Sequence, residues 1–154
     1  MNTTQQAVLI VQAPFYQDIT GQLLQGATTV LEQAGYAHET VTVPGVFEIP
    51  AAIRFALRAM ELGSASRRYV GFVTLGCVIR GETDHYEFIC RAATDALMNL
   101  STEFAIAHGL GILTCENQEQ AWVRADITQK NLGGRAAEAC LAMIGVKNKF
   151  HLAT

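Results

Sequence analysis

The chain has 154 residues, of which 50% are hydrophobic and 16% are charged. This composition excludes an intrinsically disordered chain and predicts a single domain spanning residues 1–154, large enough to bury a core. The net charge of -3 gives no sign of the basic face that a nucleic-acid partner would favour. No apolar run is long and free enough of glycine to cross a membrane, and the first six residues lack the basic segment that begins a signal peptide.

Four cysteines are spread widely along the chain, at Cys77, Cys90, Cys115 and Cys140. None forms a Cys-x-x-Cys pair, and each lies among apolar neighbours. This pattern predicts reduced thiols in the core of a cytoplasmic protein, and the spacing does not fit a zinc site.

Hydrophobic periodicity divides the chain into alternating strands and helices. The predicted strands cover residues 7–12, 37–43, 69–79 and 110–114. The predicted helices cover residues 18–34, 50–60, 88–104, 120–124 and 136–144, the last closed by Gly145. We expect the fourth strand, like the first and third, to be buried. The alternation predicts an α/β fold, a three-layer α/β/α, flavodoxin-like four-stranded parallel sheet with helices on both faces.

The strand predicted at residues 69–79 is the clearest of the four. It is an almost unbroken apolar run with two internal glycines, which favours a strand buried on both faces over a helix. The chain then turns polar from Arg80 to His85. Because Asp84 and Glu87 are three residues apart, we expect them to be the N-cap and capping-box partner of the next helix. A helix start offers N–H groups and a partial positive charge to an anion.

Three polar loops meet at one edge of such a sheet, because the carboxyl ends of parallel strands lie together. Phe15 in the first loop is either a stacking surface for a planar ring or an ordinary apolar plug. Glu48 in the second either binds ligand hydroxyls or is a solvated charge. His85 in the third is either a general acid–base or a packed or solvated helix-start residue. Arg124 either binds a phosphate or lies on the surface. Glu82 and His85 form only one Glu-x-x-His pair, so we expect no metal site.

Two long motifs and several shorter ones carry a resemblance to a known family. The long motifs are Val-Pro-Gly-Val-Phe-Glu-Ile-Pro at residues 43–50 and Gly-Cys-Val-Ile-Arg-Gly-Glu-Thr-Asp-His-Tyr-Glu at residues 76–87. The shorter ones are Gly-Ile-Leu-Thr at residues 111–114, Glu-Gln-Ala at residues 119–121 with Arg124, and Gly133-Gly134. They follow one another over nearly the whole chain, which resembles the lumazine synthase family.

This resemblance implies a cofactor-free transferase of riboflavin biosynthesis. Such an enzyme condenses 5-amino-6-(D-ribitylamino)uracil with 3,4-dihydroxy-2-butanone 4-phosphate to give 6,7-dimethyl-8-ribityllumazine, phosphate and water. The alternative is a non-catalytic protein of the same fold that binds lumazine or flavin. The implied partners are small-molecule substrates and further copies of the chain, with no nucleic acid and no membrane.

The resemblance also implies a role for each matching residue. Those that hold the ribitylamino-pyrimidine would be Phe15, Val46, Phe47, Glu48, Val78, Ile79 and Leu110. Phe15 would stack on the ring and Glu48 would accept the ribityl hydroxyls, while the backbone of Val78 and Ile79 would read the ring edge. Leu110 stands where an aromatic residue is common, which makes that wall of the pocket less aromatic.

The phosphate side of the implied site follows the strand predicted at residues 69–79. Gly81, Glu82 and Thr83 would cradle the phosphate, and His85 would move protons. Arg124 would pair with the phosphate from a neighbouring subunit.

The resemblance further implies a homo-oligomer built from pentamers. Leu132 stands where many members carry a lysine, so this position does not supply a second cation to the phosphate. Shell-forming members commonly have glycine between the last two helices, and residues 126–132 have none. We therefore expect a cyclic pentamer with active sites shared between adjacent subunits.

Overall fold

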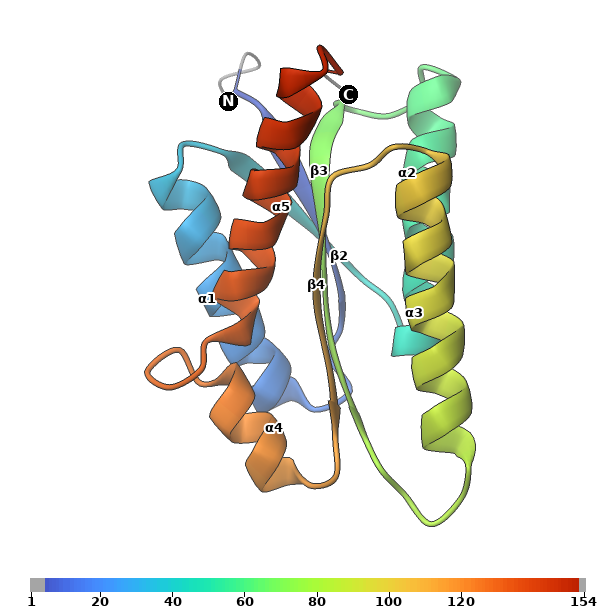
Figure 1. Ribbon diagram of the computed structural model, residues 1–154, viewed down its shortest axis with the longest axis vertical. Helices are drawn as coiled ribbons and strands as arrows, with labels where there is room; N and C mark the ends of the chain where they lie inside the picture. The colour runs from blue at the N-terminus through green and yellow to red at the C-terminus, as the bar shows by residue number, and fades with distance from the viewer. Residues whose placement is uncertain (1–4, 153–154) are drawn as a thin grey trace.

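Within residues 5–152, which the computed structural model describes, four parallel strands form a single sheet (Figure 1). The strands are β1 (Ala7–Ala13), β2 (Ala37–Thr42), β3 (Tyr69–Ile79) and β4 (His108–Cys115). Their order across the sheet is β2-β1-β3-β4. Residues 1–4, on which most of the signal-peptide prediction falls, lie outside the described residues. The predicted four-stranded parallel sheet is confirmed.

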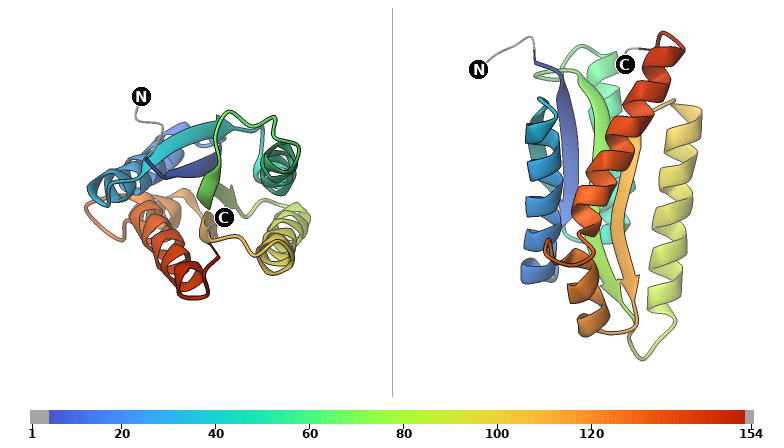
Figure 2. Two further views of the ribbon diagram at one scale, coloured as in Figure 1. Left: turned by 90° about the horizontal axis from the view of Figure 1, so that it is seen from above. Right: turned by 60° about the vertical axis from the view of Figure 1, so that its left-hand side comes forward.

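Helices cover both faces of the sheet (Figures 1 and 2). On one face lie α1 (Gln17–Gln33), α4 (Gln118–Ala125) and α5 (Leu132–Lys149). On the other lie α2 (Ile49–Glu61), which a short 3-10 helix η1 (Val46–Glu48) precedes, and α3 (His85–Glu103). Because each crossover returns the chain to a parallel strand, the carboxyl ends of all four strands meet at one end of the sheet.

Each face of the sheet has its own hydrophobic core. Alternate residues of β1 point to opposite faces, so that Val8 and Ile10 pack under α1 and α5 while Leu9 and Val11 pack under α2 and α3. The central strands β1 and β3 are buried along almost their whole length. The apolar run at residues 69–79 therefore matches β3 because both of its faces are covered.

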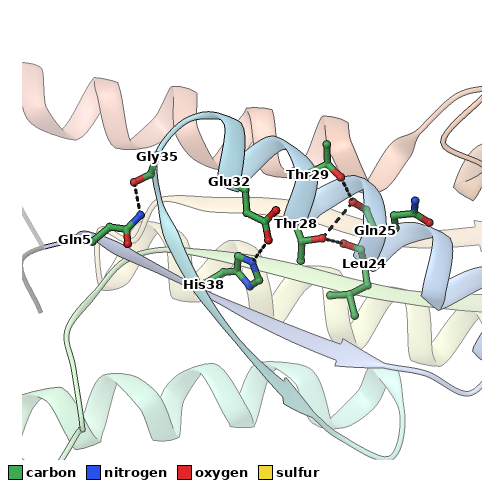
Figure 3. Close-up of polar contacts among 8 residues, drawn as sticks. All are labelled: Gln5, Leu24, Gln25, Thr28, Thr29, Glu32, Gly35 and His38. Carbon is green, nitrogen blue, oxygen red and sulfur yellow. Dashed lines mark hydrogen bonds and ion pairs between the residues drawn. The ribbon is translucent and has the colours of Figure 1, made fainter. Parts of the chain in front are cut away.

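The edge strand β2 is polar and largely exposed, and side chains tie it to α1 (Figure 3). The turn between the two elements passes through Gly35, whose φ of +83° favours glycine. Gln5 Nε2 donates to the Gly35 carbonyl at 2.8 Å, and His38 Nε2 lies 2.9 Å from Glu32 Oε1. These contacts hold the start of β2 against the end of α1, and the turn between them against the segment that precedes β1.

The last helix is longer at both ends than predicted. α5 begins at Leu132, directly before the Gly-Gly pair, and runs past Gly145, which does not close it. Gly133 and Gly134 are buried in its first turn. A Cβ on Gly133 would lie 2.0 Å from the Leu23 carbonyl oxygen, so this glycine permits close packing on α1 instead of breaking the helix. Gly145 is exposed and is tolerated within the helix.

Three further expectations about local structure need correction. Asp84 occupies the N-cap position of α3, as expected, but its side chain makes no capping hydrogen bond, and α3 begins at His85 rather than at Phe88. Instead, the His85 N–H group donates to Thr83 Oγ1 at 3.3 Å. β4 is buried on one face only. Its buried residues alternate with more exposed ones, which face away from α5, and Leu110 among them is 48% exposed.

No helix among residues 5–152 has both the length and the apolar character needed to cross a membrane.

Candidate active site

A cavity of about 650 Å³ opens at the carboxyl ends of the strands. The loops after β1, β2 and β3 and the first turns of α3 form its walls. Seven of the residues singled out in the sequence line it: Phe15, Val46, Phe47, Glu48, Val78, Ile79 and His85. Segments far apart in the sequence thus meet at one site, as expected for an open parallel sheet.

The loop after β1 gives the cavity an aromatic wall. Phe15 is 75% exposed, and its ring contacts Tyr16 edge-to-face with centroids 5.1 Å apart. An aromatic side chain left this exposed in a cavity contributes little to the core. Its free face is available to a planar ligand.

The short 3-10 helix η1 forms another wall. Val46 is buried against β3, where a Cβ on Gly76 would lie 2.8 Å from Val46 Cγ2. The glycine therefore lets η1 approach the strand closely. With Val46 buried in this way, Phe47 is left 61% exposed. No ion pair within residues 5–152 involves Glu48. The Glu48 carboxylate is thus available for hydroxyl groups of a ligand.

The start of α3 brings His85 to the cavity. Ile89, one helical turn further along, lines the same wall. Gly81, Glu82 and Thr83 form the exposed connection between β3 and α3 and do not line the cavity itself. They are close in sequence to a residue that does line the cavity, since only Asp84 separates them from His85.

Cys77 lines the cavity but is not suited to nucleophilic attack. Burial raises the pKa of its thiol to about 12, and the nearby Cys115 adds to this shift. The side chain is 5% exposed, which agrees with the prediction of a core thiol. Among residues 5–152 no group of three or more His, Cys, Asp or Glu side chains could hold a metal ion.

The substrate-binding residues assigned from the sequence leave out part of the lining. The additional residues are Ala13, Tyr16, Gly45, Cys77 and Ile89. Ile89 could have been found, because a residue four positions after His85 lies on the same face of a helix. Ala13 and Cys77 line the cavity from strands β1 and β3, and Tyr16 and Gly45 line it from the loops after β1 and β2.

Comparison with known proteins identifies the family. The family model described as 6,7-dimethyl-8-ribityllumazine synthase matches residues 5–148. The chain belongs to this family. A relative from Paramagnetospirillum magneticum named 6,7-dimethyl-8-ribityllumazine synthase is 47% identical over 147 residues, 96% of this chain and 98% of the relative. A synthase of the same name from Bartonella tribocorum is 52% identical over 93% of this chain and 91% of the relative.

Two residues that the lumazine synthase resemblance assigned to substrate binding lie outside the cavity of their own chain. Arg124 is on α4, on the opposite side of the sheet from His85, and its Nη1 donates to the Gln120 carbonyl at 3.0 Å. Leu110 is on β4 and does not reach the cavity. Within one chain, the structure therefore separates these two residues from the seven candidates that line the cavity.

Proposed function

We propose that this protein condenses 5-amino-6-(D-ribitylamino)uracil with 3,4-dihydroxy-2-butanone 4-phosphate, releasing phosphate and water and forming 6,7-dimethyl-8-ribityllumazine. The observation that supports this most directly is the meeting of Phe15, Glu48 and His85 in one cavity of a lumazine synthase family chain. An aromatic face, a free carboxylate and a histidine match the three parts of this chemistry.

Each group has a role that its position supports. Phe15 stacks on the pyrimidine, and Glu48 accepts hydrogen bonds from the ribityl hydroxyls. The backbone at Val78 and Ile79, where β3 ends beside the cavity, offers polar groups to the ring edge. These contacts hold the amine of one substrate next to the carbonyl of the other, which supplies much of the rate enhancement.

His85 moves protons while the Schiff base forms, phosphate leaves and the ring closes. None of these steps requires a covalent nucleophile, which agrees with the protonated state of Cys77. Gly81, Glu82 and Thr83 hold the phosphate from the loop that precedes His85. Arg124 reaches the same phosphate from an adjacent subunit.

Sharing of the site between subunits agrees with the exposed residues of this chain. Arg124 and Leu110 lie away from the cavity, and large apolar side chains such as Phe55, Phe88 and Met98 are exposed on α2 and α3. We infer a cytoplasmic homopentamer in which α4 and β4 of one subunit complete the cavity of the next. The helix faces would then be covered within the assembly.

Turnover measured together with binding tests the proposal. Purified protein is mixed with both substrates, and lumazine formation is followed against the slow reaction without protein. We expect formation well above that background. Saturable binding of the pyrimidine amine without any acceleration would instead identify a binding protein, and the enzyme proposal would be wrong.

A further inference from the structure

Arg80 is the most extensively paired side chain at the cavity end of the sheet. Its Nε donates to both carboxylate oxygens of Glu116, at 2.9 and 3.2 Å, and its Nη1 donates to Glu87 Oε1 at 3.3 Å. The guanidinium carbon lies 4.5 Å from the centroid of the Tyr86 ring. The Arg80 N–H group also donates to the Cys115 carbonyl at 2.9 Å, which continues the ladder between β3 and β4.

These contacts link the two ends of the loop that we assign to phosphate binding. Residues 81–84 leave Arg80, and the chain then returns to its side chain through Tyr86 and Glu87 in the first turn of α3. His85 lies between these two ends in the sequence. Because the loop itself is exposed, contacts at its two ends are what fix its path.

The same side chain connects the loop to the helix that carries Arg124. Glu116 follows β4, and its N–H group donates to Gln120 Oε1 at 2.9 Å. The Gln120 carbonyl in turn accepts from Arg124. The connection between β3 and α3 and that between β4 and α4 lie at the same end of the molecule (Figure 1). Arg80 therefore joins the two parts of the chain that we assign to phosphate binding.

The pairing also limits what else Arg80 can do. Two carboxylates offset its charge, and the hydrogen bonds that Arg80 donates to them, mainly to Glu116 and less to Glu87, raise the pKa of the guanidinium. Its Nη2 group makes no hydrogen bond with residues 5–152, but the two carboxylates offset the positive charge that would attract a phosphate. A cation held in this way is better suited to ordering its surroundings than to binding the substrate.

We propose that Arg80 is a positioning residue, which holds residues 81–84 and His85 in place for the phosphate substrate without contacting it. This inference rests on the proposed function, because it assumes that the loop binds phosphate. It assigns to Arg80 a role that the family resemblance did not give it.

Steady-state kinetics of the intact protein test the proposal. Arg80→Gln should raise KM for 3,4-dihydroxy-2-butanone 4-phosphate and lower kcat, each by roughly fivefold, the effect of losing one well-formed exposed ion pair. KM for the pyrimidine amine should not change. Glu116→Gln should act in the same direction but less strongly, because it leaves the Glu87 and Tyr86 contacts of Arg80 in place. The double variant should be no worse than Arg80→Gln alone, because the ion pair that Glu116→Gln removes is already lost in Arg80→Gln.

Arg91→Gln is the matched control. Arg91 is an exposed arginine on α3, and the described residues form no ion pair with it. This variant should keep wild-type kinetics. If Glu116→Gln instead lowers KM for the phosphate substrate, Arg80 binds the phosphate directly and the positioning role is wrong. Unchanged kinetics in Arg80→Gln, or an equal rise in KM for both substrates, would also overturn it.

Hydrogen exchange of the free protein separates this inference from the proposed function. The backbone amides of His85 and Phe88, which donate to Thr83 Oγ1 and to the Asp84 carbonyl, should exchange about fivefold faster in Arg80→Gln, and somewhat faster in Glu116→Gln, than in wild type or Arg91→Gln. If the wild type forms no lumazine but the loop loosens as expected, the proposed function fails while the positioning role stands. If Arg80→Gln does not fold, Glu116→Gln alone carries the measurement, and unchanged exchange there contradicts the proposal.

Discussion

At the scale of single residues, His85 and His108 show how position decides what a histidine can do. His85 begins α3 beside the cavity, where a ligand can reach it. His108 lies at the start of β4, where its Nε2 is 2.8 Å from Thr74 Oγ1 of the neighbouring strand. Burial lowers the pKa of His108 to about 4, so it is neutral at physiological pH.

Replacement of His85 should slow the reaction more than it weakens substrate binding. Proton transfer matters mainly in the transition state, so His85→Ala should lower kcat by about 10²-fold, the low end for general acid–base catalysis. Steady-state rates between pH 6 and 8 provide the measurement. His151→Asn, an exposed change near the end of the chain, serves as the control. A wild-type kcat in His85→Ala over this range would exclude His85 from the chemistry.

Acidification should destabilise the protein through His108. Its pKa falls from an ordinary 6.5 in the unfolded chain to about 4 in the folded protein. Between these values the unfolded chain binds the extra proton, so stability is lost as pH falls, by up to about 3 kcal/mol. Urea unfolding at pH 7 and pH 4.5, at fixed protein concentration, should show a smaller acid loss for His108→Gln than for wild type. Equal losses would mean that His108 is protonated at little cost.

At the scale of secondary-structure elements, α5 contains a matched pair of glycines with opposite roles. Gly133 packs against the backbone of α1, whereas a Cβ on Gly145 would meet no atom within 4 Å. Gly133→Ala should therefore destabilise the protein by about 1–3 kcal/mol through overpacking. Gly145→Ala should stabilise it by about 0.5–1 kcal/mol through helix propensity. Urea midpoints compare the two variants, and similar shifts in both would show that contact with α1 is not what requires Gly133.

The elements differ in how well the sequence predicts them. The ends of β3 are predicted to the residue, because an unbroken apolar run shows in the local sequence that both faces of the strand are covered. The ends of α5 are not, because a glycine inside a helix costs only about 1 kcal/mol and the contact of Gly133 with α1 is tertiary. The exposed face of β4 was missed for a related reason, since alternation there depends on which helix covers the strand.

Some features of the candidate site could likewise be predicted from the sequence, and others could not. Phe15, Glu48 and His85 could be predicted to meet, because each follows the carboxyl end of a strand in a parallel sheet. The pairing of Arg80 with Glu116 could not, because the two residues are far apart in sequence and both belong to irregular segments. The position of Arg124 across the sheet from His85 also required the fold.

At the scale of the whole molecule, we expect a cyclic pentamer and not a larger shell. Light scattering should give a mass close to five times 16.7 kDa. The segment between α4 and α5 has no glycine before Gly133, unlike the shell-forming pattern. A particle of shell size would contradict this expectation.

Mixed assemblies test whether sites are shared between subunits. His85→Ala and Arg124→Ala should each be impaired as pure rings. If they are unfolded together and refolded in equal amounts, roughly a quarter of the interfaces should pair an intact His85 with an intact Arg124, because ring interfaces are head-to-tail. Activity should then exceed the mean of the two parents, provided that each parent is well below a quarter of wild type. Confirmed hybrid rings with only the mean activity would place the two residues in separate sites.

The packing of α5 on α1 also affects how the chain can fold as it is made. One face of the sheet is covered by α1 near the start of the chain and by α5, which ends only at Lys149. Contacts between such distant segments form only after both have been synthesised, and they slow folding relative to local helix formation. A nascent chain that stops before α5 therefore presents an open apolar sheet face, which makes it a target for chaperones and proteases.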